Sequence, residues 1–369
     1  MDLLPIELLS SIFSFACTDG GYTGTSLSAT SKYLNALSQP YALQSIALYG
    51  WPHIVAFSTS LQARNAAQTP PYLRLRCFHL YMTDRSSACP SRVCHDGLPG
   101  CNGDSYCDPS LRVVPGTSIY VGHAHNILTI LGPQLRTLTL LLSEELNTFP
   151  SAGTVPTFPC LEELTIHSSF LRALTDNRSC MPRLRRLHII QDIAFDYHFV
   201  SAVSTLAPAL THLRLSELST AVYQTGDLIH HGVASLVGPS GELAGFSEAL
   251  EKVILQFRHA DSQVSCETIS SGPLAAYSAA FFAAQLRSIL SALWRYIQHD
   301  SKRRVVVLPT CMHRDEKMNP RGCSGTRAHL YEDVRRSWAA CAAGEEGLWS
   351  IQESDVLLAY GLPGLPNLP

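Results

Sequence analysis

The clearest pattern in the chain is an aliphatic spacing of the form Leu-x-x-Leu-x-Leu, in which isoleucine or valine replaces some of the leucines. It recurs as Leu135, Leu138, Leu140; Leu161, Leu164, Ile166; Leu184, Leu187, Ile189; Leu210, Leu213, Leu215; and Leu250, Val253, Leu255. The first residues of these groups lie 26, 23, 26 and 40 positions apart. Short alternating segments predict half-buried β-strands, and their recurrence predicts an array of stacked repeats.

The segments between these groups predict how each strand connects to the next. Four groups begin with a proline two residues before the first leucine, namely Pro133, Pro159, Pro182 and Pro208. A proline at this place ends the preceding helix and stands outside the sheet, so no ladder hydrogen bond is lost. Helical patterns over 120–131, 197–206 and 274–299 are the candidate crossovers, and two earlier relatives of the spacing begin at Leu43 and Leu75.

Intervals of about 20 to 29 residues are typical of leucine-rich repeats. We therefore expect an α/β fold, an irregular leucine-rich-repeat solenoid over residues 49–310 with its strands on the concave side, and an insertion at about 83–116. The irregularity is expected because the position three after the last strand leucine, commonly Asn or Cys, holds Ser143, Ser169, Asp192, Leu218 and Arg258. The alternative is an ordinary α/β sheet with leucine-rich strands.

The first forty residues have helical rather than strand periodicity. Pro5 stands where a helix begins, and Leu8, Leu9, Ile12, Phe13 and Ala16 form one helical stripe. Asp19-Gly20-Gly21 predicts the end of this helix. A second helix is predicted to begin after Thr25 or Ser26 and to end before Pro40.

These residues resemble an F-box. The resemblance rests on Leu4-Pro-x-Glu-Leu-Leu-x-x-Ile12-Phe13-x-Phe15, followed by Leu27-Ser28-x-x-Ser31-Lys32-Tyr33-Leu34 and Pro40. The loop Thr18-Asp-Gly-Gly-Tyr-Thr-Gly24 is similar to that of the F-box proteins expanded in mushroom-forming fungi. Leucine-rich repeats are a usual companion of the F-box in that family.

The resemblance implies a small three-helix module, residues 1–48, that binds the Skp-type adaptor of a cullin-RING ubiquitin ligase. The contact positions that it implies are Leu4, Pro5, Leu8, Leu9, Ile12 and Phe13 from the first helix, and Leu27, Ser28, Lys32 and Leu34 from the second. An apolar helical face that so small a module cannot bury within itself needs a partner groove. The alternative is that these helices only cap the solenoid.

The composition bears on the class of partner and on the compartment. Charged residues make up 15% of the chain and the net charge is −3, which argues against a nucleic-acid partner. Residues 274–297 are interrupted by Gln285, Arg287 and Arg295, so no membrane span is expected. Because Pro5 and Glu7 interrupt an amino-terminal stretch that lacks a basic start, we expect no signal peptide, a cytoplasmic or nuclear location and reduced thiols.

Two features bear on chemistry. Four of the 12 cysteines, Cys89, Cys94, Cys101 and Cys107, lie in the predicted insertion and are candidate zinc ligands, although the spacing lacks a tight C-x2-C pair; a simple loop is the alternative. The common catalytic and nucleotide-binding motifs are absent, so we expect a non-enzymatic protein without a cofactor.

The C-terminal region, 311–359, is predicted to cap the last repeat through Trp338 and Trp349, or else to form a wall of a substrate pocket; residues 360–369 are predicted to be a flexible tail. With the resemblance, these features predict a substrate-recognition subunit of a Skp-cullin-F-box ligase that binds an unknown protein substrate. A leucine-rich interaction scaffold without a ligase role is the alternative.

Overall fold

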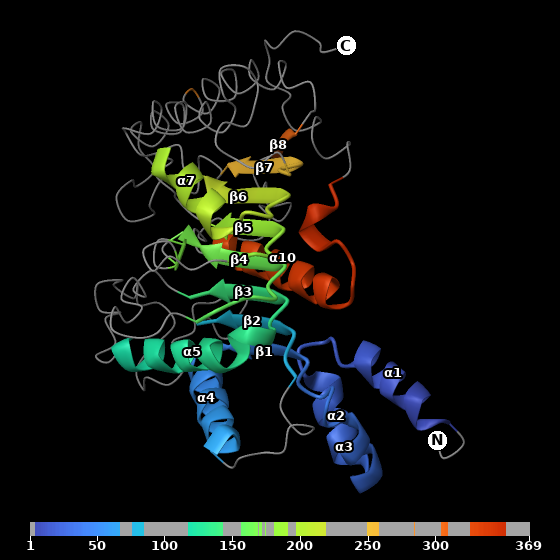
Figure 1. The fold of residues 1–369 in the computed structure, drawn as a ribbon. Coiled ribbons are helices and arrows are strands. Elements are labelled where there is room, and N and C mark those ends of the chain that lie inside the picture. Colours follow the sequence, from blue (N-terminus) through green and yellow to red (C-terminus); the bar gives the residue numbers. More distant parts are fainter. Residues whose placement is uncertain are drawn as a thin grey trace. The chain divides into compact units, whose positions relative to one another are not determined.

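The fold is α/β, with seven described α-helices and eight described strands that run parallel and are numbered in chain order (Figure 1). The structure is a computed structural model, and it describes residues 4–66, 76–84, 117–142, 156–168, 170–171, 174, 181–190, 197–218, 249–257, 284, 304–308 and 325–351. The chain divides into two compact units. The first comprises 1–161, 169–179 and 327–347, and the second comprises 162–168, 180–326 and 348–369.

Residues 4–44, which we call the amino-terminal module, form three short helices: α1 (Ile6–Ala16), α2 (Tyr22–Thr30) and α3 (Lys32–Ser38). α1 begins directly after Pro5, whose φ of −54° is already close to the helical value. The predicted second helix is therefore corrected in two respects, since it begins earlier than Thr25 and is broken at Ser31. Ser31 has an extended backbone, and its hydroxyl accepts a hydrogen bond from the Leu34 amide, which caps α3.

In the first unit, β1 (Ser45–Tyr49), β2 (His79–Thr83) and β3 (Thr137–Leu141) pair in parallel, with β2 in the middle. All three lie on the aliphatic spacing, whose residues on these strands are buried: Ile46, Leu48, Leu80, Leu138 and Leu140. Because β1 already begins at residue 45, the helical module ends a few residues before the predicted boundary at 48.

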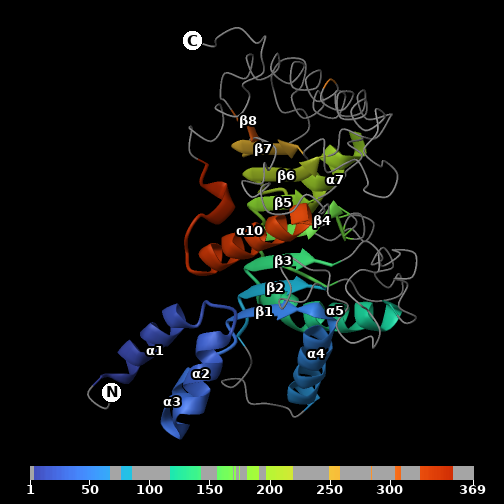
Figure 2. The same ribbon diagram turned by 180° about the vertical axis from the view of Figure 1, so that it is seen from behind.

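Helices lie on both sides of these three strands. α4 (Gly50–Ala66) and α5 (Thr117–Leu131) follow β1 and precede β3, respectively, and the Asn126 amide of α5 donates to the Ser58 hydroxyl of α4 over 3.0 Å. α10 (Gly325–Ala342) lies on the opposite side of the strands from α5, as the two views show (Figures 1 and 2). The sequence predicted α5 closely but not α4, whose apolar positions are too sparse to form a clear stripe.

In the second unit, five strands pair in parallel in chain order: β4 (Glu163–His167), β5 (Arg186–Ile190), β6 (His212–Leu218), β7 (Lys252–Phe257) and β8 (Val305–Leu308). α7 (Tyr197–Leu206) connects β5 to β6 over the predicted range. On β4, β5 and β6 aliphatic residues of the spacing alternate with polar residues, so one face of these three strands is aliphatic and the other is rich in polar side chains.

The four prolines that precede a strand occupy equivalent turns. In each turn the amide of the first leucine donates to the carbonyl oxygen of the residue before the proline: Leu135 to Gly132, Leu161 to Phe158, Leu184 to Met181 and Leu210 to Ala207, over 3.0–3.3 Å. Proline suits the second position of such a turn because its φ is fixed and its missing N–H is not required. The predicted role of these prolines outside the sheet is confirmed.

The strands show one irregularity, between β6 and β7, where the pairing register shifts between Leu215 and Leu218. Glu217 has a φ of 63° at this place, which is unusual for a residue other than glycine. The predicted crossover at 274–299 lies outside the described residues apart from residue 284, and the predicted tail at 360–369 lies wholly outside them. Among the helices that the structure describes, none is long and apolar enough to cross a membrane.

Candidate functional site

α1 exposes a continuous stripe of large apolar side chains. Leu8, Ile12 and Phe15 follow one another at spacings of four and three residues, so they lie on one side of the helix. Their exposed fractions are 52%, 49% and 76%, and Leu4 and Ile6 at the start of the helix are also exposed. Adjoining large apolar side chains at the surface mark an interaction site on a soluble domain.

The opposite side of α1 faces the interior of the amino-terminal module. Leu9 and Phe13, two of the contact residues that the resemblance implied, are only 2% and 3% exposed, and Cys17 one turn later is fully buried. Burial raises the pKa of the Cys17 thiol, so this cysteine is a core residue. We therefore assign Leu9 and Phe13 to the internal packing of the module and leave them out of its exposed surface.

The remaining implied contact residues lie on α1, α2 and α3. Pro5 is exposed at the start of α1, and Lys32 is exposed at the start of α3. Leu27, Ser28 and Leu34 are half-buried. The Ser28 hydroxyl donates to the Gly24 carbonyl oxygen one turn earlier, so part of its hydrogen-bonding capacity is used within α2.

The sequence did not assign Ile6, Phe15, Tyr22 and Tyr33 to the site, although all four are large and exposed. Phe15 continues the spacing of Leu8 and Ile12, so the helical period alone would have identified it. No comparable signal exists for Tyr22 and Tyr33, because they belong to two short helices whose relative placement depends on the turn at Ser31.

The loop between α1 and α2 attaches the module to the outer edge of β1. The Ala47 amide donates to the Gly20 carbonyl oxygen over 3.3 Å, and the Gly20 amide donates to the Ser45 hydroxyl over the same distance. The Ser45 hydroxyl in turn donates to the Thr18 carbonyl oxygen, and the Gln44 side-chain amide donates to the Ser14 carbonyl oxygen. These bonds satisfy polar groups at the edge of β1 that pairs with no described strand; such an edge otherwise invites association with other chains.

Four residues in this loop and the start of α2 have a structural reason for their identity. Gly20 and Gly21 have φ values of 81° and 99°, a region that glycine adopts without steric cost. The Asp19 carboxylate accepts hydrogen bonds from the Thr23 amide and hydroxyl, which caps the first turn of α2. Gly24 lies against the backbone of Ala42, where a Cβ atom would approach the Ala42 carbonyl oxygen to 2.3 Å.

α10 packs on β1 and β2 through aromatic side chains. The ring of Tyr81 lies 5.6 Å from the indole of Trp338 on α10 and 5.5 Å from the ring of Tyr49 on β1. Burial raises the pKa of both tyrosines, and the Arg335 guanidinium hydrogen-bonds to Tyr49. The prediction that Trp338 packs on the last repeat is wrong, because it contacts the second strand.

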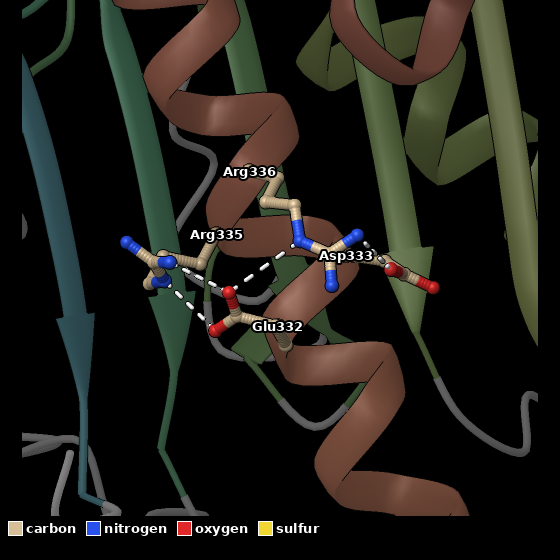
Figure 3. A network of polar contacts seen from close by, with 4 residues as sticks. All are labelled: Glu332, Asp333, Arg335 and Arg336. Carbon is tan, nitrogen blue, oxygen red and sulfur yellow. Dashed lines mark hydrogen bonds and ion pairs between the residues drawn. The ribbon is translucent and has the colours of Figure 1, made fainter. Parts of the chain in front are cut away.

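The polar side of α10 carries a small network of charges (Figure 3). The Arg335 guanidinium binds the Glu332 carboxylate in a bidentate manner over 2.8 and 2.6 Å, and Arg336 approaches the same carboxylate over 3.4 Å. Hydrogen bonding from Arg335 lowers the pKa of Glu332. Ion pairs this exposed add little stability, so we assign this network to orienting Arg335 toward Tyr49.

The strand face of the second unit carries a second polar cluster, formed by His188 on β5, Arg214 and Ser216 on β6, and Gln256 on β7. The first three are 2%, 5% and 0% exposed. The Ser216 hydroxyl lies 2.9 Å from His188 Nε2 and donates to Gln256 Oε1 over 3.2 Å. Arg214 donates to Ser216 and to Gln256, and its Nη1 donates to the carbonyl oxygen of Leu348 over 2.7 Å.

The predicted zinc ligands Cys89, Cys94, Cys101 and Cys107 lie outside the described residues. Within the described ranges, no group of three or more His, Cys, Asp or Glu residues is arranged to hold a metal ion. The four described cysteines, Cys17, Cys77, Cys160 and Cys341, carry free thiols.

In comparisons with known proteins, no family model matches the chain, and neither a curated protein nor a solved structure is significantly similar to it.

Proposed function

We propose that this protein is the substrate-recognition subunit of a Skp-cullin-F-box ubiquitin ligase, in which α1 binds the Skp-type adaptor and the parallel strands bind a protein substrate. The observation that carries the proposal is the exposed stripe of Leu8, Ile12 and Phe15 on a helix whose other side is already packed. The sequence of the same helix resembles an F-box, and the resemblance and the exposure agree on Leu8 and Ile12.

The physical argument for a partner on α1 is the hydrophobic effect. Side chains of leucine, isoleucine and phenylalanine gain roughly 1.5–3 kcal/mol each when they pass from water into an apolar contact. A helix with one buried and one exposed apolar side is the form of peptide that binds in a hydrophobic groove, with contacts at i, i+4 and i+7. The buried side keeps α1 attached to its own module while the exposed side contacts the adaptor.

The proposed subunit performs no bond chemistry itself. Its effect is to hold a bound substrate near the charged conjugating enzyme, which replaces a bimolecular encounter with a local one. The near-neutral net charge of −3 agrees with a protein substrate rather than a nucleic acid.

The fold also restricts where a substrate can bind. α10 covers the strand face of the first unit by packing Trp338 on Tyr81, so that face is already occupied by the chain itself. The substrate surface that we propose is therefore on the second unit, where the polar side chains Arg214 and His188 contact Leu348 and Trp349.

The test is association of the purified full-length chain with a purified Skp-type adaptor, measured by size-exclusion chromatography with an established F-box protein as the positive control. The proposal predicts a stoichiometric complex. If the control binds the adaptor and this chain does not, the ligase role is excluded, and an interaction scaffold that uses the same strands becomes the function to pursue.

A further inference from the structure

The polar cluster on β5, β6 and β7 binds a peptide segment in the structure, and that segment is the chain's own Leu348–Trp349. Arg214 Nη1 donates to the main-chain carbonyl oxygen of Leu348 over 2.7 Å. The indole of Trp349 stands edge-on to the rings of His188 and His212, with centroids 6.4 and 6.0 Å away and interplanar angles of 78° and 80°. The strand face thus contacts one main-chain carbonyl and one large aromatic ring.

The hydrogen bonds beneath the segment hold the arginine in place. Ser216 has one hydroxyl proton, which it donates to Gln256 Oε1, so it accepts from Arg214 Nε at 3.3 Å and from His188 Nε2 at 2.9 Å. His188 therefore carries its proton on Nε2. Burial, with the Arg214 charge as a smaller contribution, keeps the pKa of His188 well below its ordinary value, so the ring is neutral. Each of these hydrogen bonds thus has one donor and one acceptor, and Arg214 Nη1 remains directed at the Leu348 carbonyl oxygen.

A buried cluster of charged and polar side chains is not what selection for stability alone would place on a strand face. A buried guanidinium loses several kcal/mol of hydration, and replacing buried charged groups with apolar side chains is often neutral or stabilising. On the other face of the same strands the buried residues are aliphatic, namely Leu187, Leu213 and Leu255, and their burial carries no desolvation penalty of this kind. A polar, oriented cluster in this position has the properties of a recognition surface.

We propose that this cluster is the substrate-binding site of the chain and that Leu348–Trp349 occupies it as an internal ligand. The external ligand is a peptide segment that offers a main-chain carbonyl followed by a large aromatic side chain, and it displaces the internal segment on binding. Main-chain recognition by Arg214 gives affinity, and the space between His188 and His212 gives selectivity for the aromatic ring. That the bound peptide is a ligase substrate rests on the proposed function, but peptide binding at this site requires no adaptor.

The test uses the full-length chain and a fluorescein-labelled synthetic peptide of residues 344–351, Gly-Glu-Glu-Gly-Leu-Trp-Ser-Ile, followed by fluorescence anisotropy without adaptor. Trp349→Ala weakens the internal ligand, so this variant is expected to bind the peptide at least tenfold more tightly than the wild type, where the tethered segment competes at high effective concentration. Adding Arg214→Gln to Trp349→Ala is expected to weaken binding at least tenfold. A peptide with alanine in place of tryptophan is expected not to bind.

Two further variants keep the test decisive. Ser350→Ala changes an exposed neighbour of Trp349 and is expected to behave like the wild type. Trp349→Phe retains an aromatic ring and is used if Trp349→Ala does not fold, as judged by circular dichroism. Absence of peptide binding by a folded Trp349 variant overturns the proposal, and so does loss of the fold in both variants, because an internal ligand must be replaceable. Because no adaptor is present, either result leaves the adaptor-binding test unaffected.

Discussion

The indole of Trp338 lies 5.6 Å from the ring of Tyr81, so a helix near the C-terminus packs on the second strand of the chain. The same indole lies close to the loop between α1 and α2, where a Cβ atom on Gly20 would be 3.8 Å from Trp338 Cη2. Trp338 therefore joins α10, β2 and the amino-terminal module in one contact region.

Replacing Trp338 with alanine is expected to lower the free energy of unfolding by about 3–5 kcal/mol, because it removes a large buried ring and leaves a cavity next to Tyr81. Trp338→Phe is the matched control. Trp338 Nε1 is buried without a hydrogen-bond partner among the described residues, so phenylalanine loses no hydrogen bond, and its cost is expected to be smaller than that of alanine because it leaves a smaller cavity. Urea unfolding followed by circular dichroism measures both, and equal losses would contradict the packing described.

Gly24 is expected to tolerate no side chain. A Cβ atom there would approach the carbonyl oxygen, Cα and carbonyl carbon of Ala42 to 2.3, 2.5 and 2.7 Å, all of them backbone atoms that cannot move independently. Gly24→Ala should therefore destabilise the amino-terminal module by about 1–3 kcal/mol.

Gly122→Ala on α5 is the control for Gly24→Ala, since a Cβ atom at Gly122 meets nothing within 4 Å. Alanine also favours helix over glycine by roughly 0.5–1 kcal/mol, so this variant should be as stable as the wild type or more so. Thermal unfolding of the two variants side by side gives the comparison. A Gly24→Ala variant as stable as Gly122→Ala would show that α2 does not pack on Ala42 in this way.

Stability is expected to fall as the pH drops from about 6.5 toward 4. Burial, with a smaller contribution from the Arg136 charge, lowers the pKa of His79 from 6.5 to about 4, and its Nδ1 lies 2.9 Å from the Thr137 hydroxyl. Between these pH values the unfolded chain binds a proton that the folded chain does not, so protonation favours unfolding. A loss of roughly 1–2 kcal/mol at pH 5 relative to pH 7 is expected from this residue.

His79→Gln should reduce that pH dependence by the share that His79 contributes and leave the share of the buried His188, while His53→Gln, a change at an exposed histidine, should leave the whole dependence in place. Thermal unfolding at pH 7 and pH 5 for the wild type and both variants measures the effect. The assignment to His79 fails if both variants have the pH dependence of the wild type.

The strands were the part of the fold that the sequence predicted best. Groups such as Leu135, Leu138, Leu140 carry a strong period-two signal, and a proline turn marks where four of the strands begin. α7 was predicted over its full range for a related reason, because its helical pattern lies between two strands already located. α4 was missed because polar residues are spread around it. For α10 the sequence predicted a capping helix with Trp338 but not the strand on which it packs, because tertiary contacts rather than a local stripe determine that place.

The candidate sites were predictable only in part. Helical periodicity located Leu8 and Ile12 together, but it did not separate them from Leu9 and Phe13, because the apolar stripe is wide enough to face both the module and the solvent. The cluster around Arg214 had no sequence signal. Its members come from three strands, and the contact with Leu348 spans 134 residues of chain.

The central claim is that the exposed side of α1 binds a Skp-type adaptor, and the most direct measurement is the dissociation constant of the full-length chain with that adaptor by isothermal titration calorimetry. The account predicts a measurable Kd for the wild type and for Ser60→Asp, a charge added at an exposed polar position of α4, outside the amino-terminal module. Leu8→Asp with Ile12→Asp should weaken binding by at least a hundredfold while the circular dichroism spectrum is unchanged. Equal affinity of the double variant and the wild type would contradict the account.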